Sequence, residues 1–80
     1  MDNIIKTVAE MEQFIDENSD CVLYISKDLN EHLSAMLAVP EKCGVNAPRE
    51  LIDAFFATHD LIGRCVIKSI KVAVAEEETK

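Results

Sequence analysis

Residues 47–74 read APRELIDAFFATHDLIGRCVIKSIKVAV, and this stretch decides the fold class that we predict for the chain. It starts like a helix, because Asn46 can cap free N–H groups, Pro48 is tolerated in a first turn and Glu50 is favoured by the helix dipole. Apolar residues then recur at helical spacing, interrupted only by Gly63, which costs about 1 kcal/mol relative to alanine inside a helix. We therefore predict one long helix over residues 47–76.

The β-branched residues of this stretch leave an alternative open. Residues 66–74 read VIKSIKVAV, and valine and isoleucine favour strands. The helix could instead end at Gly63 and be followed by a strand. The choice decides how the apolar side chains of the C-terminal half are arranged.

A single long helix would be apolar around too much of its circumference for one small domain to cover. On a helical wheel the apolar residues of 51–74 spread over roughly two thirds of the circle, whereas a helix packed on one side needs an apolar stripe of about 100°. We therefore predict a homo-oligomer, most simply one with two-fold symmetry. An extended conformation of residues 64–74 would remove this argument.

Two shorter helices are predicted before this stretch. Residues 2–17 repeat apolar side chains at helical spacing, and residues 20–38 do the same between an Asn-Ser-Asp stop and Pro40. Residues 21–25 could instead form a short strand, with a helix capped by Ser26 or Asp28 after it. The preferred interpretation is an all-α fold. It is a small bundle of three helices (2–17, 20–38 and 47–76) in a single domain over residues 1–80, oligomeric and with a long C-terminal helix.

Composition and charge restrict the possible partners. The net charge of −7 argues against duplex nucleic acid as a partner, because affinity for a phosphate backbone comes largely from Lys and Arg. The chain shows no long uninterrupted apolar stretch and no signal-peptide pattern, so we predict no membrane contact and a cytoplasmic location. Three cysteines without a Cys-x-x-Cys pair indicate reduced thiols.

Catalysis and metal binding have little sequence support. The chain has no Gly-rich phosphate loop, no Gly-x-Ser-x-Gly and no His-Glu-x-x-His motif. His32, His59 and the cysteines include no two residues close enough in sequence to form a local ligand pair. We therefore predict no enzyme activity, no metal and no cofactor.

Cations on the predicted long helix are the candidate binding residues. Arg64, Lys68 and Lys71 are spaced i, i+4 and i+7, which would place them on one stripe able to bind the phosphates of a small nucleotide or an acidic partner. Arg49 is a second phosphate candidate, because it lies near free N–H groups at the helix start. Tyr24 could stack on a base. The alternatives are a solvated helix face for the cations and ordinary packing for the tyrosine.

The C-terminal half also carries a resemblance to a known family. The residues concerned are Pro48-Arg49-Glu50, Ala54, Thr58, His59-Asp60-Leu61, Gly63 and Ile70. This pattern resembles the helical hairpin of phage anti-CBASS cyclic-nucleotide sponges, in which a Pro/Ser-Arg-Glu turn opens the second helix. The resemblance implies a non-enzymatic helical oligomer of viral origin, acting in the host cytoplasm and sequestering cyclic nucleotide signals at anion sites between subunits. The family's tyrosine, lysine and arginine contacts have no position-by-position match, so the resemblance assigns no binding residue.

A second function class is compatible with the same composition. An acidic protein–protein interaction module, such as an inhibitor or adaptor, would dock its Asp- and Glu-rich faces on a basic partner surface. Both hypotheses describe a protein that acts by binding or assembly.

Overall fold

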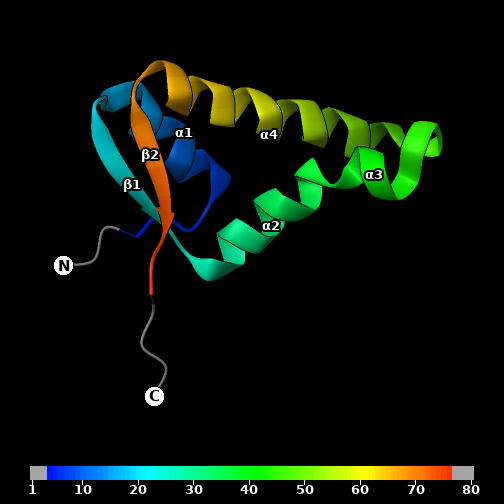
Figure 1. The fold of residues 1–80 in the computed structure, drawn as a ribbon, viewed down its shortest axis with the longest axis horizontal. Coiled ribbons are helices and arrows are strands. Elements are labelled where there is room, and N and C mark those ends of the chain that lie inside the picture. Colours follow the sequence, from blue (N-terminus) through cyan, green and yellow to red (C-terminus); the bar gives the residue numbers. More distant parts are fainter. Residues whose placement is uncertain (1–3, 77–80) are drawn as a thin grey trace.

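A computed structural model describes residues 4–76, apart from the side chain of Val45. The elements in chain order are α1 (Val8–Glu17), β1 (Cys21–Ile25), α2 (Lys27–Leu37), α3 (Val39–Cys43), the short 3₁₀ turn η1 (Gly44–Asn46), α4 (Arg49–Ile67) and β2 (Ile70–Val74) (Figure 1). The fold is mixed α/β, with four α-helices and a two-stranded sheet. The prediction of an all-α bundle of three helices is therefore wrong.

The sheet is parallel, with β1 in its middle. β1 and β2 pair over all five residues of each strand. On the other edge of β1, the Ile5 N–H donates to the Tyr24 carbonyl at 2.8 Å and the Ser26 N–H donates to the Ile5 carbonyl at 2.9 Å. β2 is consequently an edge strand, and the edge that it leaves unpaired faces away from Ile5.

The C-terminal strand corrects the predicted helix over 47–76. α4 ends at Ile67, and Ser69 turns the chain with a φ of 58°. Ile70 then enters the core with 5% of its surface exposed. Pairing with β1 satisfies the backbone of this β-branched run and buries Ile70, which a continuing helix would not do. The strand alternative had the right element but the wrong boundary, because the helix passes Gly63 and ends after Ile67.

The first half of the chain needs two similar corrections. Residues 21–25 form β1 and not the start of a helix, because Leu23 and Ile25 are buried while Val22 and Tyr24 are exposed, the alternation of a strand. α2 then begins after Ser26, whose Oγ accepts from the Leu29 N–H at 3.1 Å. This is the alternative that the sequence left open.

α1 covers only part of the helix predicted over residues 2–17. It begins at Val8, because the Thr7 Oγ1 caps it by accepting from the Glu10 N–H at 3.1 Å. Ile5 lies before this cap in extended backbone bridged to β1. Residues 2 and 3 lie outside the described residues.

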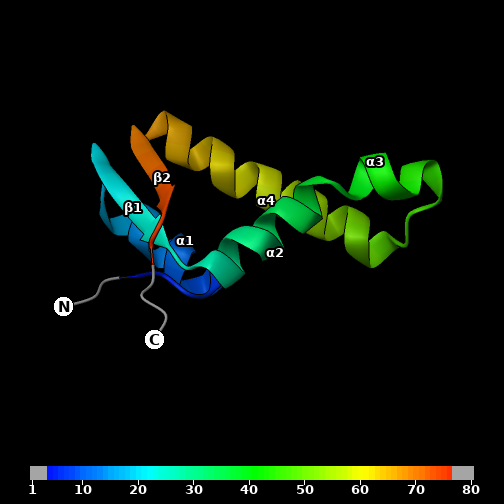
Figure 2. The same ribbon diagram turned by 60° about the horizontal axis from the view of Figure 1, so that its bottom comes forward.

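Most of the buried apolar side chains gather on one face of the sheet. One cluster joins both strands to three helices, and its members are Met11, Ile15, Leu23, Ile25, Leu29, Leu33, Leu61, Cys65 and Ile70. The chain is flat, with a shortest extent of 17 Å, and α2 and α4 run away from the sheet towards α3 (Figures 1 and 2). The opposite sheet face leaves Val22 and Tyr24 exposed.

These corrections remove the original argument for an oligomer. The apolar arc of two thirds of a circle required residues 70–74 to be helical, and they form β2. An oligomer would therefore have to form through the side chains that the fold leaves exposed.

Candidate functional site

The predicted cationic stripe is divided between two places. The Arg64 Nη2 donates to the Asp16 Oδ1 at 2.7 Å, and the Lys68 Nζ donates to the carbonyl of Ile15 and, at 3.3 Å, to that of Asp16. α1 has no basic residue in its own last turn. Arg64 of α4 and Lys68 directly after it thus supply the hydrogen bonds and positive charge that a helix C-terminus favours.

The other candidate residues lie elsewhere. Lys71 pairs with Val22 in the strand register, and Tyr24 pairs with Ala73, so Lys71 and Tyr24 share the exposed outer face of the sheet. Arg49 begins α4, fifteen residues before Arg64 and therefore about 22 Å from it along the helix axis. The structure brings Tyr24 and Lys71 onto one face, but it does not gather the four cations into one site. Their binding of phosphate remains a prediction.

Cys65 is the one side chain of residues 4–76 with a clear shift in acidity. Burial raises the pKa of its thiol, the neighbouring Arg64 lowers it and Cys21 raises it further. A raised pKa keeps a thiol protonated at neutral pH and makes it a poor nucleophile. Across the same residues, no group of three or more His, Cys, Asp or Glu side chains could hold a metal ion.

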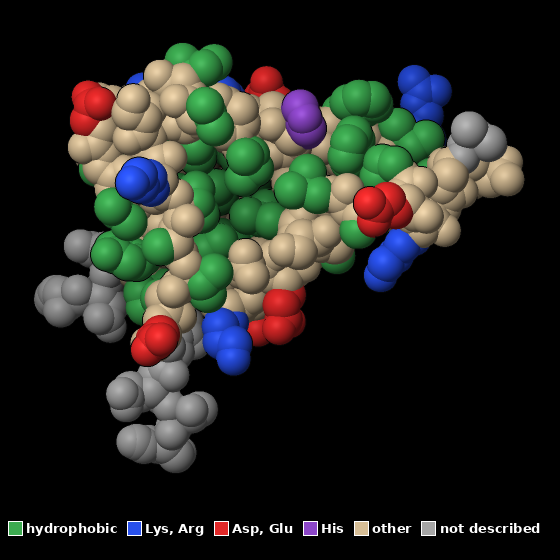
Figure 3. Space-filling model, viewed as in Figure 1, with side chains coloured by type: hydrophobic (Ala, Val, Ile, Leu, Met, Phe, Trp, Pro, Cys, Tyr) green, Lys and Arg blue, Asp and Glu red, His purple; other side chains and the backbone are tan. Residues whose placement is uncertain are grey.

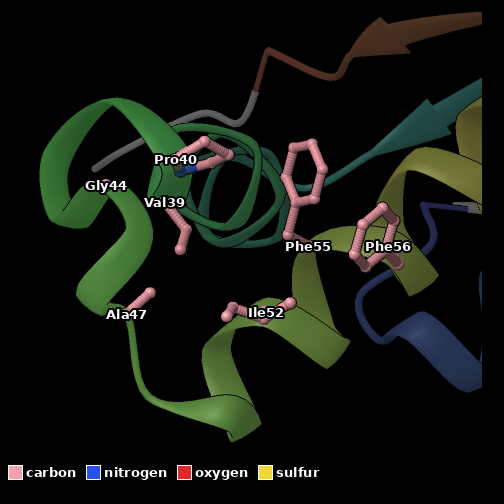
Figure 4. Close-up of a pocket in the computed structure, with 7 residues that line it drawn as sticks. All are labelled: Val39, Pro40, Gly44, Ala47, Ile52, Phe55 and Phe56. Atoms are coloured by element: carbon pink, nitrogen blue, oxygen red, sulfur yellow. The ribbon is translucent and has the colours of Figure 1, made fainter.

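An apolar cavity of about 180 Å³ lies at the end of the molecule remote from the sheet. Its lining is Val39, Pro40, Gly44, Ala47, Ile52, Phe55 and Phe56 (Figure 4). The rings of Phe55 and Phe56 meet edge to face, with centroids 5.2 Å apart. No charged side chain lines the cavity, so it lacks the convergent polar groups that orient most small-molecule ligands.

The side of the molecule opposite α1 leaves several apolar side chains incompletely buried. Because Arg64 faces α1, the wheel places Ile62 and Val66 about 160° away from it and Phe55 on the same far side. Val66 is 71% exposed. β2 is also the strand farther from Ile5. We call this the open side and define it as Phe55, Ile62 and Val66 of α4 with Val72 and Val74 of β2.

Figures 1 and 3 agree with this position of the open side. In Figure 1, β2 is drawn in front of α1. In the same view, Figure 3 shows hydrophobic side chains gathered between β2, α4 and α2, with charged side chains mostly around the margin. The open side is therefore the broad face of a flat molecule, and its centre is apolar.

The register of the sheet shows that the core is incomplete at β2. Side chains of paired residues in a parallel sheet point to the same face. Leu23 pairs with Val72 and Ile25 with Val74. Leu23 and Ile25 are 0% and 1% exposed, whereas Val72 and Val74 are 37% and 43% exposed. Two side chains that point to the core side of the sheet thus remain partly in water at its edge.

The backbone at this edge is also free. The Ala75 N–H donates to the Ile25 carbonyl at 2.8 Å. In a parallel ladder alternate residues point to the same neighbour, so Ala73 also faces β1, while the N–H and C=O groups of Val72 and Val74 face outward. Within residues 4–76 these four groups have no hydrogen-bond partner. The β-branched run was the sequence signal for this edge, but it does not reveal which side of the strand is unpaired.

Comparison with protein-family models, with curated proteins and with solved structures finds no match for the chain. None of the helices in the described part is long and apolar enough to cross a membrane.

Proposed function

We propose that the chain is a non-catalytic binding domain that accepts a partner β-strand along the free edge of β2. The observation that carries this proposal is the contrast between the buried side chains of β1 and the half-exposed side chains that pair with them in β2. A strand added beside β2 would bond the outward N–H and C=O groups of Val72 and Val74 and cover their side chains. Strand addition of this kind is a recurring mode of peptide recognition.

The edge of β2 has little protection against such pairing. Proteins usually blunt exposed edges with prolines, bulges, inward-pointing charges or a covering element. β2 reads IKVAV and contains no proline, and it pairs with β1 residue by residue without a bulge. Its one charge, Lys71, points to the outer face. Protein binding therefore has more support than the predicted cyclic nucleotide ligand, because Arg64 and Lys68 already bind α1.

A proline substitution can test the edge without disturbing the sheet. Proline at position 74 removes only an outward N–H and is tolerated on the free side of an edge strand. Val74→Thr is the matched control, since it keeps both the N–H and the β-branched shape. The probe is a fluorescein-labelled, acetylated peptide with the sequence of residues 69–75, and the readout is fluorescence anisotropy.

We expect the peptide to bind the wild-type chain and Val74→Thr, and to bind Val74→Pro at least about tenfold more weakly, because a lost buried hydrogen bond and a clash each cost about 1 kcal/mol or more. Far-ultraviolet circular dichroism checks that both variants remain folded. Absence of peptide binding to a wild-type chain that is monomeric at the assay concentration, or equal binding to Val74→Pro, would refute the proposed function.

A further inference from the structure

We infer that the strand added to β2 is β2 of a second copy of this chain, antiparallel to the first about a two-fold axis at Ala73. This inference rests on the proposed function of the β2 edge. Joining the two edges makes one continuous sheet with the helices of both copies on the same face of that sheet. The open side of each copy then covers the open side of its partner.

The charge distribution favours a second copy over a charged partner. All five residues of the open side are uncharged, although the whole chain carries a net charge of −7. A basic partner would be drawn to the acidic surfaces elsewhere on the molecule. Two copies of an acidic chain can meet without strong repulsion only across a surface that lacks acid, and the open side is such a surface.

The pairing register follows from the side chains of β2. With the axis at Ala73, Val72 lies opposite Val74 of the partner subunit, and the same contact recurs on the other side of the axis. Pairs of β-branched residues of this kind stabilise antiparallel strands. On the outer face, the central pair is alanine with alanine, which leaves the two Lys71 side chains about 13 Å apart along the strands.

The two neighbouring registers are less favourable. An axis at Val72 would bring the two Lys71 side chains into diagonal contact on one face, where like charges destabilise a sheet. An axis at Val74 would place Glu76 of the partner subunit opposite Val72, on the apolar face. The register centred on Ala73 places Glu76 of the partner subunit opposite Ile70, at the end of the paired segment. Of the three registers it alone pairs each exposed valine with the other.

A cysteine placed at the axis tests this geometry. In a Cys43→Ser background, which removes the exposed native thiol, Ala73→Cys is compared with Lys71→Cys. Both residues share the outer face of β2. Non-hydrogen-bonded antiparallel pairs have Cα atoms about 4.5 Å apart, within the range for a disulfide. Two cysteines at position 71 would be about 13 Å apart and could not bond.

We expect wild-type chain to have the mass of a dimer by size exclusion with light scattering, and Val74→Pro to associate at least tenfold more weakly. Under mild oxidation Ala73→Cys should form a covalent dimer in high yield, and Lys71→Cys little or none. A dimer that survives Val74→Pro, or equal cross-linking at the two positions, overturns the inference. A monomeric wild type that still binds the residue 69–75 peptide overturns the second copy but leaves the proposed function standing. A monomer that binds no peptide overturns both.

Discussion

Lys68 offers a sharp test of whether the predicted cationic stripe stabilises the fold or binds a ligand. Its Nζ donates to the carbonyls of Ile15 and Asp16 at the C-terminal end of α1, and its side chain is half-buried. Hydrogen bonds that involve a charged group contribute about 1.5–3 kcal/mol. Because this side chain is partly solvated, we discount that range and expect Lys68→Met to lower the free energy of unfolding by about 1–2 kcal/mol.

The matched control is Lys71→Met, which removes a lysine from the same predicted stripe. Within residues 4–76 Lys71 forms no hydrogen bond or ion pair and lies exposed on the outer sheet face. Its substitution should change the free energy of unfolding by less than about 0.5 kcal/mol. For a domain of this size, 1 kcal/mol shifts Tm by about 4–8 °C. Lys68→Met should therefore lower Tm by roughly 5–15 °C, and Lys71→Met by a few degrees at most.

Differential scanning calorimetry and urea titration measure both variants at equal chain concentration, which matters if the chain associates. Equal effects of the two substitutions, or an unchanged Tm in Lys68→Met, would refute the stabilising role of Lys68. Arg64→Met should lower Tm by an amount between those of Lys68→Met and Lys71→Met. The Arg64–Asp16 ion pair at 2.7 Å is largely solvated, and such pairs contribute about 1 kcal/mol or less.

Three further results are expected. Leu23→Ala should lower the free energy of unfolding by about 2–5 kcal/mol in urea titration, since Leu23 is fully buried. Val22→Ala on the exposed face of the sheet should lower it by less than about 1 kcal/mol. Equal effects would contradict the faces assigned to these two residues. Burial raises the pKa of the Cys65 thiol above 9.0, so the folded state keeps this proton at a pH where the unfolded state loses it. The free energy of unfolding should therefore fall as pH rises above about 9. If a Cys65→Ala variant shows the same fall with pH, Cys65 is not the cause. Gly63→Ala should raise the free energy of unfolding by about 1 kcal/mol, because nothing in the described chain lies within 4 Å of an added Cβ, and a loss of stability would indicate a contact that this chain does not supply.

Local patterns predicted some elements well because their signals lie within a few residues. α4 begins at Arg49, two residues after the predicted start, with Pro48 and not Asn46 at its N-cap, and α2 begins at the Ser26 cap that the sequence offered as an alternative. The strands were harder to predict because their evidence is not local. Residues 21–25 contain apolar residues at both helical and alternating positions, and only pairing with residues 70–74, far along the chain, selects the strand.

The arrangement of the candidate phosphate-binding cations was predicted wrongly for the same reason, because it depends on contacts between distant parts of the chain. The spacing of Arg64, Lys68 and Lys71 defines a stripe only if the helix continues past Ile67, and it does not. The carboxylate that binds Arg64 belongs to Asp16, 48 residues earlier, and the carbonyls that bind Lys68 lie beside it. No periodicity within the C-terminal half could reveal these partners. These contacts form only because α1 packs against α4 in the folded chain.

The surplus of apolar residues survives the correction of the secondary structure. Of the 80 residues 49% are hydrophobic, and so short a chain buries only about 60% of its unfolded surface whatever elements it forms. As a helix, residues 70–74 would have exposed part of that surplus around a rod. As a strand, they bury Ile70 and leave Val72 and Val74 at an edge, beside Val66 on α4. The strand also adds free N–H and C=O groups to the exposed apolar surface, and so it defines the direction and register of a partner more narrowly than a helix face would.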